Sequence, residues 1–360
     1  MMKIAVLLYQ NMRHAPFLKF YEGIFREMED VEYDVIYLDR HPELNEPDDV
    51  HHIPISWIGR DDHNVFAKFL TCATYPARVR RKLKAGKYDF IFALTTMPGG
   101  LLNNYLLHDY SGKYLLDIRD YTKEHIKAYF KAEMKVVRNS AINVISSPDY
   151  VKFLPTADYH MCHNLNLPEK ESNRIRFEKS PSKRVVIAYV GSIQYADYCF
   201  RLIKLVEEDE RFEFHFYGPE GGDLKITNYV NGLGNLRISM KGRFKPEEKE
   251  EIFTQSDLIF NCYGNDNNIV KYAISNKYYD AAYFRRPLIV SPNTTMSRLC
   301  GRFAFPIDLA KVGSLDDLYK WYRDIDSISF EQYCASIINA AQMDNFELEK
   351  LIRNKLHACL

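Results

Sequence analysis

The chain has 360 residues, with 48 Lys and Arg balanced by 48 Asp and Glu. The length fits two domains of about 100–200 residues each, and the charge balance argues against nucleic-acid binding, which needs a clustered basic excess. The seven scattered cysteines form no C-x-x-C pair, so they suggest neither a zinc site nor a disulfide framework and predict reduced thiols in a cytoplasm.

The first half of the chain alternates strand and helix patterns, as parallel α/β domains do. Residues 3–8 form an apolar strand with no cleavage-type segment after it, so no signal peptide is expected. Apolar side chains recur at helical spacing over 17–28. Further strands are expected at 34–38, 88–93, 114–116 and 141–147. Ligands of such domains bind where loops leave the carboxyl ends of the strands.

Two loops of this half carry polar side chains, but no helix or hairpin pattern fixes the spacing of these side chains. The loop at 9–16 lacks the G-x-G-x-x-G pattern of a dinucleotide-binding turn, and a surface loop explains it. Residues 41–64 are polar and irregular, and His51, His52 and His63 lack the spacing of a metal site. We therefore expect no bound metal here.

A basic helix is expected over 65–87, with a kink or restart at Pro76. Its second part, 76–87, carries the cations Arg78, Arg80, Arg81, Lys82, Lys84 and Lys87. Basic residues around an apolar stripe suit an anionic membrane surface, where each cation adds roughly 1 kcal/mol. A solvated helix face explains the pattern equally well. No apolar run approaches the roughly 20 residues that a membrane-spanning helix needs.

A pair of glycines follows the strand at 88–93. Gly99 and Gly100 would let a ligand approach the backbone closely. A plain turn before a helix at 101–109 explains them as well.

An Asp–Arg cluster follows the strand at 114–116. Asp117, Arg119 and Asp120 stand at the carboxyl end of this strand, where polar side chains are placed for function. A structural Asp–Arg pair that caps the next helix, expected to begin near Thr122, is the alternative.

The second half repeats the alternation after a linker. Residues 165–183 are charged, contain prolines and serines and lack periodicity, which predicts the linker. Strands are expected at 184–191, 212–218, 236–244, 258–260 and 288–290. Residues 292–306 read as a loop. The last helices are expected at 315–324, 329–343 and 346–358.

The stretch from Ser256 to Ser291 reads as strand, loop, helix, tight turn and strand. Its helix opens at Asn276 and ends near Phe284. A helix N-terminus offers free N–H groups and a positive dipole end, which suit a phosphate. We therefore expect an anionic ligand at this place.

This stretch resembles a segment of the GT-B glycosyltransferases. Asn276-Lys277-x-Tyr279-Asp280, followed by Arg286-Pro287-Leu288-Ile289, is similar to the NK-x-x-E…GKPVI segment of family four, especially its capsule and exopolysaccharide branch. In that family the acidic residue holds the ribose hydroxyls of a sugar nucleotide. The chain carries Asp280 where the family usually has Glu. Tyr272 stands where many members have an earlier Glu that is held to contact the donor sugar.

The resemblance implies an α/β GT-B fold, with two Rossmann-like doubly wound domains facing each other across a cleft. The expected parts are an acceptor-binding domain at 1–164, the linker at 165–183, a nucleotide-sugar-binding domain at 184–312, and C-terminal helices at 313–360 that cross back to the first domain. The implied reaction uses no metal and no cofactor, because basic side chains and helix N-termini can stabilise the leaving diphosphate.

The donor-side residues follow from the same resemblance. Gly191 and Ser192 resemble the turn at the donor diphosphate, and Tyr217 and Gly218 end a strand like the one before the base-binding turn. The Arg and Lys that often follow that glycine are missing. The candidates for the positive charge are, in order, Lys277, Lys271, Arg243 and Lys241. Asn276 and Asp280 complete the donor side.

The acceptor side is implied less specifically. Asp120 or Asp117 would bind the acceptor hydroxyl, and one of them would assist its deprotonation. The further acceptor-side candidates are Arg13, His14, Gly99, Gly100 and Arg119. The implied acceptor is a growing glycan, in many polymer-building members a polyprenyl-linked one, which favours membrane contact through 76–87. The expected location is the cytoplasm, at the inner face of the cell membrane.

The expected reaction transfers a hexose or related sugar from a nucleoside-diphosphate sugar, with retention at the anomeric carbon. Two alternatives stay open. A GT-B epimerase would act on a sugar nucleotide without an acceptor, but its characteristic acid–base cluster is not found in the sequence. A non-catalytic GT-B subunit would support a partner transferase, which the missing Glu and diphosphate-binding cations would explain.

Overall fold

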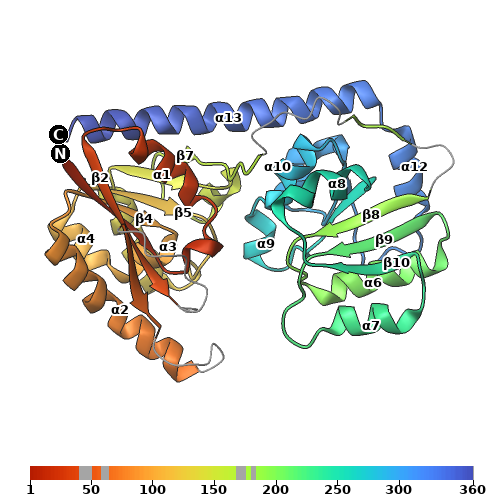
Figure 1. Cartoon of the computed structure of the whole chain (residues 1–360), viewed down its shortest axis with the longest axis horizontal. Coiled ribbons are helices and arrows are strands. Elements are labelled where there is room, and N and C mark those ends of the chain that lie inside the picture. The colour runs from red at the N-terminus through yellow and green to blue at the C-terminus, as the bar shows by residue number, and fades with distance from the viewer. Residues whose placement is uncertain (40–50, 58–64, 168–175, 180–183, 360) are drawn as a thin grey trace. The chain divides into compact units, whose positions relative to one another are not determined.

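Figure 1 shows the computed structural model of the chain, which describes residues 1–39, 51–57, 65–167, 176–179 and 184–359. The chain forms two compact units. The first unit consists of Met1–Asn164 and Ala341–Leu360, and the second of Leu165–Ala340. No helix in the described ranges is long and apolar enough to cross a membrane.

The first unit is built on a seven-stranded parallel sheet in the order β3-β2-β1-β4-β5-β6-β7. The strands are β1 (Met2–Leu8), β2 (Val31–Asp39), β3 (His52–Ser56), β4 (Phe90–Leu94), β5 (Tyr114–Ile118), β6 (Ile142–Ile145) and β7 (His160–Met161). This is a doubly wound order that reverses between β1 and β4, so a crevice forms there at the carboxyl ends of the strands.

Helices pack their apolar sides on this sheet. They are η1 (Met12–His14), α1 (Leu18–Arg26), α2 (Val65–Gly86), α3 (Thr96–Leu101), α4 (Asn103–Asp109), α5 (Lys127–Asn139) and η3 (Pro148–Lys152). In α1, the helical spacing of apolar residues puts Tyr21 and Phe25 edge-on against Phe92, with ring centroids 5.6 and 4.8 Å apart. These contacts form the centre of a core that is closed to water.

The second unit is built on a six-stranded parallel sheet in the order β10-β9-β8-β11-β12-β13. The strands are β8 (Val185–Val190), β9 (Phe212–Tyr217), β10 (Ile238–Gly242), β11 (Leu258–Asn261), β12 (Leu288–Val290) and β13 (Ala304–Pro306). The helices are α6 (Ala196–Glu208), α7 (Lys225–Leu233), η4 (Pro246–Glu248), α8 (Lys249–Thr254), α9 (Asn268–Tyr272), α10 (Asn276–Tyr283), α11 (Thr295–Cys300), η5 (Gly301–Phe303) and α12 (Asp316–Asp324).

The expected fold class, α/β with two Rossmann-like doubly wound sheets, is confirmed. Several elements differ from the sequence-based expectation. The pattern at 41–64 gave no strand, yet β3 pairs with β2, because a short edge strand tolerates a proline, here Pro54. The segment 292–306, read as a loop, contains α11, η5 and β13. The helix expected to begin near Thr122 begins at Lys127.

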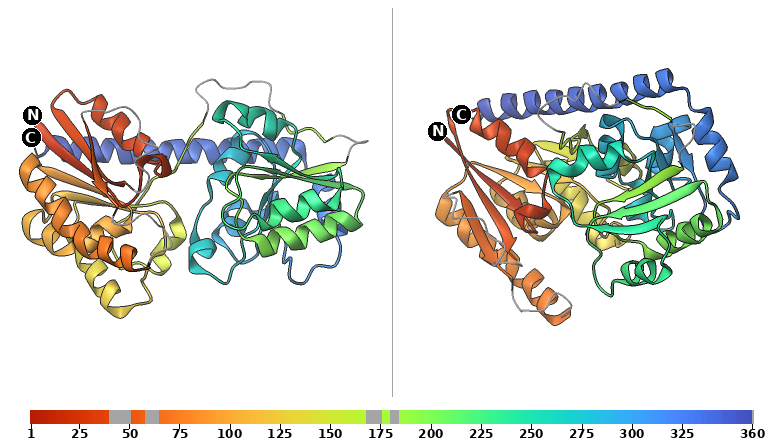
Figure 2. Two further views of the ribbon diagram at one scale, coloured as in Figure 1. Left: turned by 60° about the horizontal axis from the view of Figure 1, so that its bottom comes forward. Right: turned by 45° about the vertical axis from the view of Figure 1, so that its right-hand side comes forward.

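The C-terminal helix is longer than expected. One helix, α13 (Ser327–His357), replaces the two separate helices at 329–343 and 346–358, and Figure 2 shows it without a break. The apparent break comes from Asp344 and Asn345, which are poor helix formers. Their side chains bond to His163, where Asn345 both accepts from the backbone N–H and donates to the backbone carbonyl.

The end of α13 belongs to the first unit. Leu348, Ile352 and Leu356, at helical spacing, are buried in the core of that unit. Arg353 on the same helix bonds to Glu27 at 2.6 Å.

The residues of the predicted linker at 168–175 and 180–183 lie outside the described part of the chain. Between them, Phe177 is buried and its N–H donates to Glu331.

Candidate functional site

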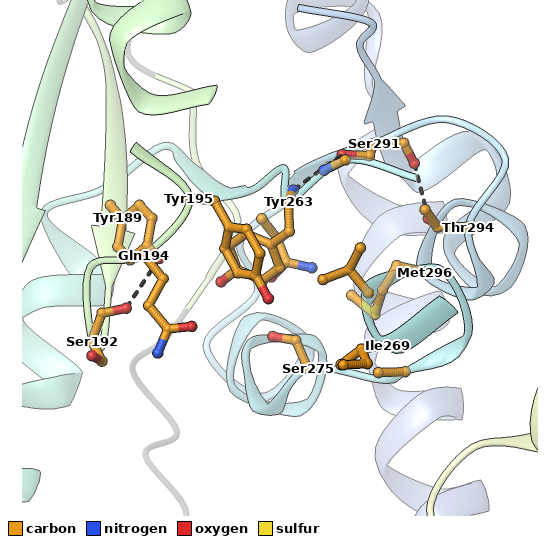
Figure 3. Close-up of a pocket in the computed structure, with 14 residues that line it drawn as sticks. Tyr189, Ser192, Gln194, Tyr195, Tyr263, Ile269, Ser275, Ser291, Thr294 and Met296 are labelled. Atoms are coloured by element: carbon orange, nitrogen blue, oxygen red, sulfur yellow. Dashed lines mark hydrogen bonds between the residues drawn. The ribbon is translucent and has the colours of Figure 1, made fainter. Parts of the chain in front are cut away.

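A pocket of about 230 Å³ lies at the carboxyl ends of β8, β11 and β12 in the second unit (Figure 3). The strand order reverses between β8 and β11, which is the usual ligand position in a doubly wound sheet. The pocket is lined by Tyr189, Ser192, Gln194, Tyr195, Asn261, Tyr263, Gly264, Ile269, Val270, Ala273, Ser275, Ser291, Thr294 and Met296.

The turn after β8 is held by two glycines with positive φ. Gly191 has φ of 116° and its N–H donates to the Tyr217 carbonyl at 2.8 Å. Gly218 has φ of 136°, and a Cβ atom there would lie 1.9 Å from the Gly191 carbonyl oxygen. Gly218 is therefore required because two backbone turns touch. The expected donor contact of Tyr217 and Gly218 stays a prediction.

Three tyrosines shape one side of the pocket. Tyr195 takes a left-handed conformation with φ of 57°, and its ring stacks on Tyr263 with centroids 4.8 Å apart. The Tyr189 hydroxyl donates to the Ser192 carbonyl and accepts from the Gln194 N–H. These bonds fix the loop that follows Gly191. A turn held this way presents its backbone and aromatic faces to a ligand.

Lys277 on α10 lies buried behind these tyrosines. Its Nζ donates to the Tyr263 hydroxyl and lies 4.5 Å from the centroid of the Tyr189 ring. The same Nζ is 3.9 Å from the position that a Cβ atom on Gly191 would take. Burial lowers the pKa of this amine to about 8, and the nearby carboxylate of Asp280 opposes the shift. The structure thus brings Gly191 and Lys277 together.

Asp280 lies one turn further along α10 and is also buried. Its carboxylate forms an ion pair with Lys249 of α8, with an Nζ–Oδ1 distance of 2.7 Å. Desolvation raises the pKa of this carboxyl, while Lys249 and Lys277 oppose the shift. An acidic residue on a helix is most simply explained as a solvated surface side chain. Asp280 is buried and paired, so that explanation does not apply to it.

The remaining donor-side candidates lie at different depths. Ser192 lines the pocket, and Asn276 is exposed at the start of α10. Lys271 is partly buried, with its Nζ 5.5 Å from the ring centroid of Tyr272. Lys241 and Arg243 are exposed at the end of β10. Lys277, the first of the proposed cations, contacts the pocket lining through its hydrogen bond to Tyr263.

In the first unit, Asp117 and Asp120 have different surroundings. Asp117 is fully buried, accepts from the Tyr21 hydroxyl at 2.8 Å and pairs with Arg119 at 2.8 Å. Asp120 is exposed, yet nearby protein atoms raise the pKa of its carboxyl to about 6 by desolvation, with Arg119 opposing. Asp117 and Arg119 therefore form a buried ion pair, which does not cap α5, since the N-cap of that helix is Ile126. Of the two carboxylates, Asp120 is the exposed one.

The other acceptor-side candidates are not gathered around Asp120 by any described contact. Gly99 lies inside α3, where a Cβ atom would come within 2.5 Å of Leu116. Close helix–strand packing thus explains Gly99, and Gly100 likewise lies in α3, beside Tyr129. His14 is exposed in η1, and the side chain of Arg13 lies outside the described residues.

A buried acidic group near Asp120 was not anticipated from the sequence. Glu133 of α5 and Glu124 before it are both buried, and neither Glu133 oxygen has a hydrogen-bond partner among the described residues. Burial first, and then the neighbouring Glu124, raise the pKa of Glu133 to about 8. Burial therefore favours the protonated, uncharged form of Glu133.

Comparison with protein-family models and with curated protein sequences finds no match. Solved structures do match over nearly the whole chain. Sucrose-phosphate synthase from Thermosynechococcus elongatus matches with a TM-score of 0.68 and 11% identity, over 99% of this chain and 100% of the other. The chain has the GT-B fold. This follows from the two sheets together with such matches to GT-B glycosyltransferases.

Two further GT-B structures resemble the chain. Anabaena HepE, solved in complex with UDP, matches with a TM-score of 0.65 and 12% identity, over 99% of this chain and 100% of HepE. A protein named as a UDP-N-acetylglucosamine 2-epimerase, from Listeria monocytogenes, matches with a TM-score of 0.59 and 11% identity, over 97% of each chain. At these identities the likeness establishes the fold alone.

In this GT-B chain, the basic helix α2 is continuous through Pro76. Arg80, Arg81, Lys82 and Lys84 are exposed, and Arg80 also lies 4.9 Å over the Tyr105 ring. Of the histidines in the irregular segment, His63 lies outside the described residues. The described part of the chain holds no group of three or more His, Cys, Asp and Glu side chains that could bind a metal ion.

The pocket residues missed in the sequence share one cause. Tyr195, Tyr263 and Asn261 reach the pocket from three loops or strand ends, and their convergence depends on turn geometry. Lys249 reaches Asp280 from a different helix. For Asn261 and Tyr263 the sequence signal was their position just after the predicted strand 258–260, where ligand-binding residues gather.

Proposed function

We propose that this chain is a glycosyltransferase that binds a nucleoside-diphosphate sugar in the second unit. One observation supports the proposal most. The amine of Lys277 lies in an apolar, tyrosine-walled recess directly behind the Gly191 turn, at the strand edge where doubly wound sheets bind ligands. UDP is the first nucleotide to test, because HepE was solved with UDP bound.

The chemistry requires stabilisation of the negative charge that develops on the leaving diphosphate. A buried cation does this more effectively than an exposed one, because little water competes with it. In the described geometry Lys277 has no carboxylate in direct contact, so its charge is available to an anion. Backbone N–H groups of the turn and the dipole of α10 add to the same field.

Asp280 is proposed to hold the ribose hydroxyls. A carboxylate accepts two hydrogen bonds from a diol, and the ion pair with Lys249 favours the charged form of Asp280 and orients it. This role is the one that the resemblance to family four implies for Asp280. Its burial beside Lys277 on the same helix supports one continuous ribose–diphosphate site.

Asp120 is proposed as the group that binds the acceptor hydroxyl and assists its deprotonation. A base works best when its pKa lies near the working pH, and desolvation by the surrounding protein atoms raises the pKa of the exposed Asp120 to about 6. The backbone next to Asp120 is held by two contacts of Arg119. Its side chain pairs with Asp117, and its carbonyl accepts from the Tyr150 hydroxyl at 2.6 Å.

The finer assignments rest on the sequence resemblance. They are retention at the anomeric carbon without a metal, a glycan or polyprenyl-linked acceptor, a role in capsule or exopolysaccharide synthesis, and contact of 76–87 with the inner face of the membrane. The exposed cations of α2 support the last of these.

The epimerase alternative is favoured by one structural match but not by the pocket. An epimerase needs acid and base groups around the sugar. None of the 14 described lining residues is a carboxylate or a histidine. The non-catalytic alternative predicts nucleotide binding without turnover.

A thermal-shift panel tests the proposal, with UDP, GDP, ADP, CMP and dTDP measured with and without magnesium. A ligand at a hundred times its Kd adds about 2.7 kcal/mol, which raises Tm by a few degrees. We expect one nucleoside diphosphate to raise Tm equally with and without magnesium. No rise with any of them would refute the donor site.

A further inference from the structure

Tyr195 is held in a backbone conformation that bulky residues rarely adopt. It has φ of 57° and ψ of 52°, in the left-handed region, directly before α6. Glycine takes this conformation freely, whereas a tyrosine takes it at a cost in free energy. Residues strained in this way gather at ligand sites, where the surrounding structure holds them in place. The strain therefore points to a role for the side chain of Tyr195.

The ring of Tyr195 is fixed by its neighbours. One face stacks on Tyr263, with centroids 4.8 Å apart and ring planes at 27°. Tyr263 is held in turn by Lys277, which donates to its hydroxyl. The backbone before Tyr195 is pinned by the Ile193 N–H, which donates to the Pro219 carbonyl at 2.8 Å. A ring held in this way loses little conformational freedom when a ligand stacks on it.

The same ring stays open to solvent. Tyr195 is 37% exposed and lines two cavities of the second unit. One is the pocket of about 230 Å³ described above. The other has about 410 Å³ and lies between the loops that follow β8 and β9. Because Ser192, Gln194 and Tyr195 line both cavities, a ligand in either one adjoins this loop.

A polar side chain neighbours the exposed ring. Gln194 is exposed, and its hydrogen bonds in the described chain run through the backbone, where its N–H donates to Tyr189 and its carbonyl accepts from Cys199. The side-chain amide, with two donor hydrogens and an acceptor oxygen, faces solvent instead. Figure 3 shows Gln194 and Tyr195 together among the residues that line the pocket.

The Gly191 turn precedes Tyr195 by four residues in the same loop. In the proposed donor complex the diphosphate lies at this turn, beside Lys277. The sugar of a nucleoside-diphosphate sugar is bonded directly to the second phosphate, so it lies within one ring length of that phosphate. A loop that runs from the diphosphate turn to Tyr195 is therefore placed to contact the sugar.

We propose that Tyr195 and Gln194 form the platform that binds the sugar ring of the donor. A hexopyranose carries C–H groups on its ring faces and hydroxyls around its rim. The negative face of an aromatic ring attracts the C–H groups, and a side-chain amide exchanges hydrogen bonds with the hydroxyls. The inference rests on the proposed function, since it assumes a nucleoside-diphosphate sugar in the second unit.

Calorimetry on the whole chain tests the platform by comparing Tyr195→Leu with the wild type. One ligand is the nucleoside diphosphate that the thermal-shift panel selects. The other is the sugar nucleotide of the same base that the wild type binds most tightly, chosen for uracil from UDP-glucose, UDP-galactose and UDP-N-acetylglucosamine. Tyr195→Leu should weaken the sugar nucleotide by about fivefold or more, as expected for a lost aromatic contact. The Kd of the diphosphate should change by less than about twofold.

Three further variants complete the comparison. Tyr195→Phe keeps the ring and should bind both ligands as the wild type does. Tyr229→Leu is the matched control and should change neither Kd, because Tyr229 of α7 is also 37% exposed but packs on Phe200. Gln194→Ala should weaken the sugar nucleotide alone, and an unchanged Kd would remove Gln194 from the platform. If Tyr195→Leu does not fold, Tyr195→Gly replaces it, because glycine suits the left-handed backbone.

Failure of the platform differs from failure of the donor site. If Tyr195→Leu weakens the diphosphate and the sugar nucleotide equally, the ring holds the base or only shapes the loop, and the platform is wrong. If it weakens neither ligand, or if the wild type binds the diphosphate but none of the sugar nucleotides, the platform is also wrong while the nucleotide site stands. If no nucleoside diphosphate binds, the proposed function fails as well.

Discussion

At the scale of single residues, the account depends on how burial changes ordinary side chains. The motif around Asn276 predicted that Lys277 and Asp280 belong to one site, and their placement on α10 follows from helical spacing alone. The sequence did not predict the partner of Asp280, because Lys249 comes from another helix. The sequence also did not distinguish the roles of Asp117 and Asp120. These residues differ in burial, and burial depends on the whole sheet.

Asp280→Asn should weaken binding of the nucleoside diphosphate by about tenfold or more, since a hydrogen bond to a charged group contributes about 1.5–3 kcal/mol. Calorimetry on the folded variant measures this. Asp317→Asn, an acidic position at the start of α12, is the matched control and should bind as the wild type does. Equal affinities of Asp280→Asn and the wild type would remove the ribose assignment.

Asp120→Asn should lower kcat strongly and leave donor affinity near normal, because Asp120 lies in the first unit. Since the pKa of its carboxyl in the free chain is about 6, wild-type kcat/KM for the acceptor should rise with pH up to about 7 and then level off, as the ionised base forms. The variant should lack this rise. A fall in donor affinity instead would place Asp120 elsewhere.

At the scale of elements, continuous apolar runs made most strands predictable. β1, β4, β5, β11 and β12 are buried on both faces, so their sequences contain almost no polar residues. β3 was missed because an edge strand with His52 and Pro54 lacks that pattern. The course of α13 was missed because Asp344 and Asn345 break the pattern, and their partner His163 is distant in sequence.

Helix α5 carries an element-scale prediction through Glu133. Its pKa in the folded state, about 8, lies above the unfolded value, so the folded state holds more protons between pH 4.5 and 8 and stability falls as pH rises through that window. Glu133→Gln removes this loss. At pH 7 the variant should be more stable than the wild type by up to about 3 kcal/mol.

Urea unfolding at pH 5, 6, 7 and 8 measures the difference between Glu133→Gln and the wild type. The difference should grow with pH, while Glu29→Gln, at an exposed position, should show none. A difference that stays constant from pH 5 to 8 would mean that Glu133 is not held protonated.

At the scale of the whole molecule, the chain passes between its two units twice, after Asn164 and after Ala340. His163 bonds to Asp344 and Asn345 close to both positions, within the first unit. These bonds therefore connect the place where the chain leaves the first unit to the place where it comes back. We infer that they fix α13 on the first unit.

Asn345→Ala should therefore lower the free energy of unfolding of the first unit by about 1–3 kcal/mol, because two backbone groups of His163 lose their partner. Asn354→Ala, at an exposed position of the same helix, should change it by less than about 0.5 kcal/mol. Chemical denaturation followed by a probe in the first unit measures both. Equal effects of the two substitutions would show that the His163 bonds contribute nothing.

The most direct test of the account is the affinity of the nucleoside diphosphate chosen by the panel, measured by calorimetry from pH 7 to 9.5 in the wild type and in Lys277→Met. The pKa of the free amine is about 8, so wild-type affinity should fall above that pH by up to about tenfold per unit, as the cation is lost. The variant should bind at least about tenfold more weakly at pH 7, with no such fall. Equal affinity at pH 7, or the same pH dependence in both proteins, would contradict the proposed donor site.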